Sequence, residues 1–103
     1  MNNSKLDTIF DYICHAFMVD KKVLFSKNKT KRVSWARHAS YQLLCDLYGM
    51  TDGETSLFMG RCRCSGVLSR ATARNLLETN KHFSEAYEHA YSLIKNDQNL
   101  RAQ

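Results

Sequence analysis

The chain has 103 residues, the length of a single ordinary domain. Hydrophobic residues make up 44% and charged residues 24% of it, which excludes a disordered chain and leaves material for one core but not for two. The net charge is +5, and many of the basic residues gather in two windows without an acidic residue, residues 21–37 and 55–77. Such windows favour a surface that binds a polyanion, and the alternative interpretation is a solvated face.

Apolar residues recur at helical spacing from the start of the chain. Proline is absent and only four glycines occur, which favours helices over a β fold with many turns. The first helix is expected over residues 6–17, with Ser4 as its N-cap, and Asp20 is expected to cap a short turn over residues 23–25. A polar, basic loop follows at residues 26–30.

The next predicted helix has the clearest apolar stripe, over residues 33–47, and Gly49 is expected to end it. Arg37 and His38 lie off this stripe, so both are expected on the outside of the helix. Trp35 lies partly off the stripe, so it either packs beneath the basic loop or is exposed.

Three more helices complete the predicted fold. A short helix over Asp52–Met59, capped by Thr51 or Asp52, is expected to end near Gly60, and a longer helix follows over residues 64–79. The last predicted helix carries an apolar stripe over residues 83–94.

The whole pattern predicts an all-α fold, a compact bundle of five or six helices that contains a helix-turn-helix. We expect one domain over residues 1–95 and a frayed tail over residues 96–103.

The helix-turn-helix would be formed by the two helices on either side of Gly60, and the alternative is a plain helical hairpin within the bundle. The first N–H groups of the second helix attract phosphates, and small side chains there let the backbone approach a DNA groove closely. The residues of this element that we expect at the DNA are Arg61, Arg63, Cys64, Ser65, Gly66, Ser69, Arg70 and Arg74.

The basic loop is the second candidate contact, since a basic arm ahead of a helix commonly reaches along a DNA backbone or into its minor groove. The basic residues expected to do so are Lys27, Lys29, Lys31 and Arg32.

Residues 26–39, SKNKTKRVSWARHA, resemble the basic loop and following helix of the C-terminal DNA-binding domain of the bacterial replication initiator DnaA. The similarity continues through residues 59–61 and 65–68, and it extends to the flanking helices, so that it spans most of the chain. It implies a Trp-repressor-like helix-turn-helix and an accessory or regulatory role in replication or transcription.

The resemblance also implies roles for single residues. Lys29 stands where the family has an arginine in the minor groove, and Arg37 matches a family arginine at the major groove. His38 stands where the family often has glutamine, and Ser65 matches a small hydroxyl residue that reads bases.

Two departures from the family pattern bear on sequence recognition. The family signature Asp-His-Ser/Thr-Thr reads RCSG at residues 63–66, and Ser69 replaces a histidine that reads bases. Cysteine and glycine lack the hydrogen bonds and methyl contacts that specify bases in the major groove. We therefore expect phosphate binding to be kept and recognition of the family's usual site to be lost.

Several other functions are not favoured by the sequence. It lacks the G-x-x-x-x-G-K-[ST] loop, so we expect neither binding nor hydrolysis of ATP, and no signature of an enzyme surrounds any cysteine. Cys62 and Cys64 lack the second ligand pair of a structural zinc site, although a redox switch at Cys64 is an alternative. We expect no cofactor.

The chain has no signal-peptide pattern and no apolar run of the roughly 20 residues that a membrane span needs. We therefore expect a cytoplasmic, nucleoid-associated protein with double-stranded DNA as its partner. The rival hypothesis is a protein-interaction module that kept the fold, lost the DNA site and binds an acidic or replication-related partner.

Overall fold

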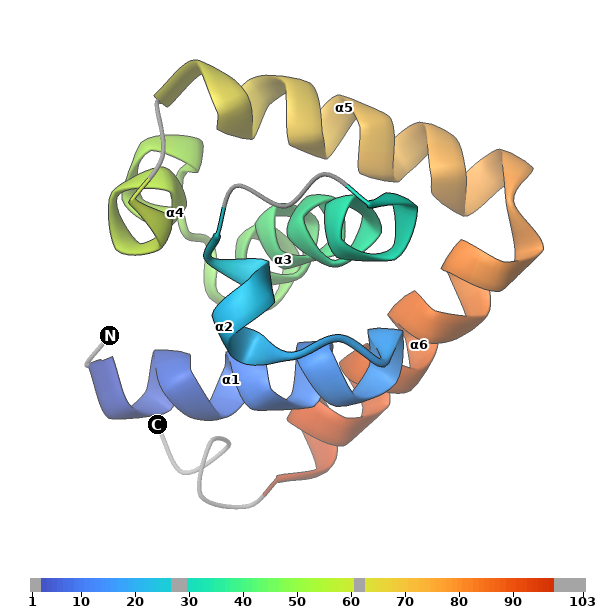
Figure 1. Cartoon of the computed structure of the whole chain (residues 1–103), viewed down its shortest axis with the longest axis horizontal. Helices are drawn as coiled ribbons and strands as arrows, with labels where there is room; N and C mark the ends of the chain where they lie inside the picture. The colour runs from blue at the N-terminus through green and yellow to red at the C-terminus, as the bar shows by residue number, and fades with distance from the viewer. Residues whose placement is uncertain (1–2, 27–29, 61–62, 98–103) are drawn as a thin grey trace.

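The computed structural model describes residues 3–26, 30–60 and 63–97. Over these ranges the chain forms six helices and no strand, which confirms the predicted all-α bundle (Figure 1). The helices in chain order are α1 (Asn3–Phe17), α2 (Lys21–Leu24), α3 (Lys31–Tyr48), α4 (Asp52–Met59), α5 (Arg63–Thr79) and α6 (Lys81–Asn96).

Most of the predicted helix ends are confirmed. Asp20 caps α2 by accepting from the backbone N–H of Lys22 at 2.9 Å. Thr51 rather than Asp52 caps α4, in a capping box with Glu54. The prediction for Ser4 is wrong, because α1 already begins at Asn3 and Ser4 lies inside the helix.

Two glycines end helices as the sequence predicted. Gly49 after α3 and Gly60 after α4 have φ angles of +65° and +69°, in the left-handed region where glycine carries no steric penalty.

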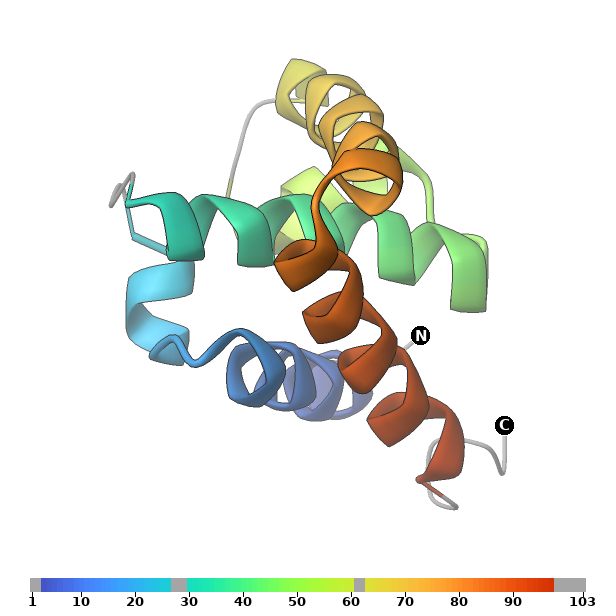
Figure 2. The same cartoon turned by 90° about the vertical axis from the view of Figure 1, so that its right-hand side faces the viewer.

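Helix α3 occupies the centre of the molecule. It lies between α5 on one side and α1 on the other, and α6 runs across the side of these layers (Figure 2). With neighbours on several sides, α3 buries more than one face, so that Ser40 and Tyr41 are buried along with the predicted apolar stripe.

Apolar and aromatic side chains join α1 to α6. Phe17 and Phe83 lie with ring centroids 5.6 Å apart, and Ile13 and Ile94 are fully buried in the same core. Trp35 of α3 packs edge-on against Phe83 at 5.8 Å and is half-buried. None of the described helices is both long enough and apolar enough to cross a membrane.

Candidate nucleic-acid interface

Helix α5 lies close against α3 and α4 at Gly66. A Cβ atom at this position would lie 2.6 Å from Asp52 Cβ and 2.9 Å from Tyr41 Cε1. Such distances are too short for real carbon atoms, so Gly66 is the residue that lets the helices approach. This corrects the prediction that Gly66 faces a DNA groove, because Gly66 is buried against Asp52 and Tyr41.

His38 and Ser69 also face each other between α3 and α5. The Nδ1 atom of His38 lies 3.1 Å from the Ser69 hydroxyl, which is 8% exposed. Burial lowers the pKa of His38, and the neighbouring charge of Arg37 lowers it further. Burial of Ser69 corrects the prediction that it contacts a base, whereas His38 is half-buried, with Nδ1 directed to Ser69.

Arg70 is directed inward in the same interface. Its Nε lies 2.7 Å from Oδ1 of Asp52, and Nη2 donates to Oδ2 at 3.2 Å. Nη1 donates to the Cys45 sulfur at 3.1 Å. The charge of Arg70 is thus directed to a carboxylate of α4, which lies against α5 at Gly66.

Arg37 is buried as well, with 6% of its surface exposed. Its Nε donates to the carbonyl of Leu24 at 2.8 Å, and Nη2 donates to the carbonyls of Val23 at 3.3 Å and of Ser26. The guanidinium therefore joins α3 to carbonyls at the end of α2 and just beyond it. This corrects the prediction of a DNA contact at Arg37.

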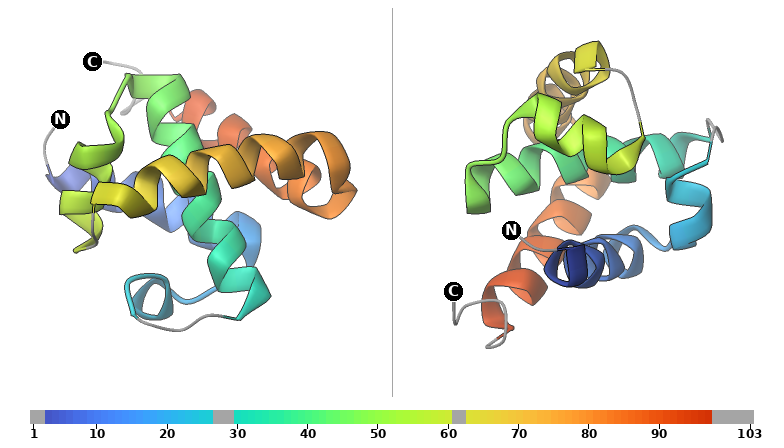
Figure 3. Two further views of the ribbon diagram at one scale, coloured as in Figure 1. Left: turned by 90° about the horizontal axis from the view of Figure 1, so that it is seen from above. Right: turned by 90° about the vertical axis from the view of Figure 1, so that its left-hand side faces the viewer.

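The predicted cations that are exposed lie at the start of α3 and on α5. Lys31 and Arg32 are exposed in the first turn of α3, and Arg74 is exposed on α5. Figure 3 (left) shows α5 crossing α3, with the first turns of α3 projecting beyond α5 on the side of α2. The described carboxylates form no ion pair with Lys31, Arg32 or Arg74.

The outer face of α5 differs from the one that the sequence predicted. Val67 and Leu68 are 60% and 70% exposed, and Ala71 and Thr72 are exposed one turn further on. The sequence itself could have indicated this face. At helical spacing these four residues lie on the side of the helix opposite Gly66, Ser69 and Ala73.

The structure describes the remaining predicted residues only in part or not at all. Lys27, Lys29 and Arg61 lie outside the described residues. For Arg63, Cys64 and Ser65 the structure describes only the helical backbone, which begins α5.

Cys14 is a buried thiol in the apolar core, and burial raises its pKa to about 11. Among the described residues, no three histidine, cysteine or carboxylate side chains come together as metal ligands.

Comparison with known proteins gives no family for the chain. No protein-family model matches it, and no curated protein matches it either.

Proposed function

We propose that the chain binds double-stranded DNA through the outer face of α5 and the first turn of α3, with α4 and α5 acting as a helix-turn-helix. The observation that carries the proposal is that α5 has no carboxylate before Glu78, which lies in its last turn. From Gly66 to Leu77 this helix carries no carboxylate, and the facing Asp52 is neutralised by Arg70. A phosphate backbone can approach such a face without repulsion.

The corrected contacts change the expected division of roles. Lys31, Arg32 and Arg74 are the exposed cations available to phosphates. Val67, Leu68, Ala71 and Thr72 would face the major groove, where small apolar groups contact the methyl group of thymine. We infer that any sequence preference comes from Arg74 and Asn75, the exposed side chains of α5 that can make paired hydrogen bonds to a base.

A pair of matched lysines tests the proposal. The Lys31 ammonium lies 5.0 Å from the ring centroid of Trp35, and the Lys95 ammonium lies 5.3 Å from that of Tyr91. Lys95 is in the last turn of α6, outside the proposed surface. The two alanine variants therefore lose the same charge and the same kind of ring contact.

Duplex affinity of the two variants is measured across a salt titration. If Lys31 neutralises one phosphate, Lys31→Ala weakens binding evenly across sequences and flattens the log–log salt slope by about one, while Lys95→Ala leaves both unchanged. Equal effects of the two variants would contradict the proposed surface. No duplex binding at about 50 mM salt would contradict DNA binding altogether.

The exposed apolar residues favour a second candidate function, binding of a protein partner. Leu57 on α4 is 83% exposed, and Val67 and Leu68 are exposed on α5. Exposed apolar side chains that lie together favour a protein interface. Leu57→Ser separates the two functions: a protein interface would be weakened by it, whereas binding governed by phosphates would be unchanged.

A further inference from the structure

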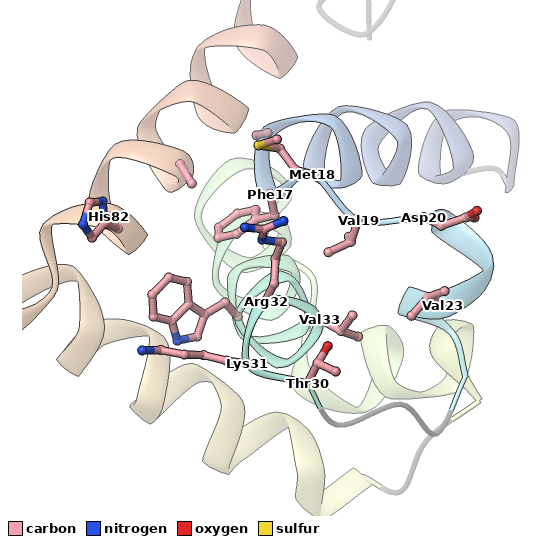
Figure 4. Close-up of a pocket in the computed structure, with 13 residues that line it drawn as sticks. Phe17, Met18, Val19, Asp20, Val23, Thr30, Lys31, Arg32, Val33 and His82 are labelled. Atoms are coloured by element: carbon pink, nitrogen blue, oxygen red, sulfur yellow. The ribbon is translucent and has the colours of Figure 1, made fainter.

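A groove of about 800 Å³ lies on the side of the molecule where four helices meet. It is bounded by the end of α1, by α2, by the first turns of α3 and by the start of α6 (Figure 4). Its floor is apolar: Phe17 and Val33 are buried there, and Val19 and Trp35 are half-buried. A surface of this kind can bury a large apolar side chain of a ligand.

Met18 stands at the edge of the groove in an unusual backbone conformation. Its φ is +59°, and it is the one non-glycine residue with positive φ in the described part of the chain. The N–H groups of Met18 and Val19 donate to the carbonyls of His15 and Cys14, the pattern of a left-handed helix end that glycine usually provides. With methionine there, a flexible apolar side chain is 74% exposed beside the groove.

Charge is distributed unevenly along the groove. Lys31, Arg32 and His82 line one part, and all three are exposed (Figure 4). Asp20 lies at the opposite end, where its carboxylate caps α2 instead of facing the cations. The groove thus combines an apolar floor with a cationic end.

We propose that this groove binds an acidic peptide segment that carries a large aliphatic or aromatic side chain. The apolar side chain lies on the floor beside Trp35 and Met18, and the carboxylates of the peptide pair with Lys31 and Arg32. Such an arrangement follows from complementary charge and from the apolar area available for burial.

A nucleic acid strand fits this groove less well than a peptide. Bases bind single-strand grooves by stacking on an open aromatic face. Here the ammonium of Lys31 lies over the ring of Trp35, and Phe83 packs against the same ring. The other aromatic ring of the floor, Phe17, is only 4% exposed and so offers no open face for stacking.

The proposal is tested by selection from a library of random peptides displayed on phage, with the full chain as bait. Trp35 is the only tryptophan, so its fluorescence reports binding in the groove directly. The expected result is enrichment of peptides that contain both acidic and large apolar residues, with a saturable change in this fluorescence. Enrichment of basic peptides, or no enrichment, overturns the proposal.

One matched pair of variants and one single substitution locate the binding. Lys31→Glu is expected to weaken the binding of an enriched peptide at least about tenfold. Lys95→Glu makes the same change of charge over the Tyr91 ring and is expected to leave the binding unchanged. Met18→Gly relieves the backbone strain, so the fold is kept or stabilised, while the side chain at the edge is lost. Its expected effect is weaker peptide binding at an unchanged or higher Tm. Unchanged affinity in both Lys31→Glu and Met18→Gly overturns the proposal.

Lys31 and Arg32 belong to both proposed surfaces, so variants at other positions keep peptide binding and DNA binding apart. Met18→Gly affects the peptide and leaves the duplex unchanged. Arg74→Ala does the reverse, since Arg74 is exposed on α5 and does not line the groove.

Discussion

The contact between α1 and α6 and the contact of α5 with α3 and α4 bury different kinds of side chain. The first is built from aromatic and aliphatic groups, with Phe17 against Phe83 as an example. The second contains His38 against Ser69, Arg70 against Asp52, and a glycine at the closest approach. Polar residues can therefore form a packed interface here, because each has a partner within it.

This difference shows which parts of the molecule a sequence pattern can reveal. An apolar contact leaves a regular stripe on each helix, so the stripe over residues 83–94 correctly predicted the buried side of α6. A polar contact leaves no such stripe, so its residues look like surface residues. In a basic window they also look like DNA contacts.

The largest effect is expected in the apolar contact. Phe83 is fully buried and its ring contacts Phe17, Trp35 and Tyr87. Phe83→Ala removes this ring from the core and is expected to lower the free energy of unfolding by about 3–5 kcal/mol. Urea denaturation followed by circular dichroism measures the change. A loss below about 1 kcal/mol would show that α6 does not depend on the apolar contact.

A smaller loss of stability is expected from substitution of Arg37. This substitution tests whether the charge of Arg37 supports the fold. Arg37→Met keeps much of the side-chain volume but leaves the carbonyls of Val23, Leu24 and Ser26 without this donor. The expected loss is about 2–3 kcal/mol in the free energy of unfolding, measured by the same denaturation.

The matched control for this prediction is Arg32→Met, five positions earlier on α3 and exposed. It is expected to change the stability by less than about 0.5 kcal/mol. If the two variants were equally stable, Arg37 would have no structural role.

The smallest change in stability is expected when the pH is lowered, because His38 then takes up a proton. Its pKa in the folded protein lies below the ordinary value of 6.5, because burial disfavours the charged ring. The unfolded chain therefore binds a proton at a higher pH than the folded protein does. Stability is complete above the unfolded pKa and falls as the pH drops below it toward the folded pKa.

Thermal denaturation from about pH 7.5 to about pH 5.5 measures this effect, with His38→Gln as the comparison. The fall in Tm over this range should be smaller in the variant than in the original chain. An identical pH dependence in both would mean that His38 does not resist protonation in the folded state.

The fold was largely predictable, and the candidate site only in part. Helical spacing located the helices, and Asp20, Gly49 and Gly60 marked helix ends, because these signals are local to the chain. Arg37 could not be placed in the same way, since its partners are carbonyls of a separate short helix. Gly66 gave no sign of its contact with Asp52, because that distance is set by how two helices cross.

The Trp35 alternatives were decided by the structure. The ring packs against Phe83 and beneath Lys31, so it is half-buried at the groove. The groove arises from residues of α1, α2, α3 and α6 that are far apart in the sequence. A linear pattern could not bring these residues together.

The hydrogen bonds of Arg37 also affect how freely the charge at the start of α3 can change. Arg37 donates to the carbonyl of Ser26, and the carbonyl of Thr30 accepts from the N–H of Ser34 at 2.9 Å as α3 begins. Neither interaction uses the side chain of Lys31 or Arg32, and both side chains are exposed. Exchange of these two side chains should therefore cost little stability. Evolution or protein engineering can alter their charge, and graft new specificities onto this turn, while the scaffold stays the same.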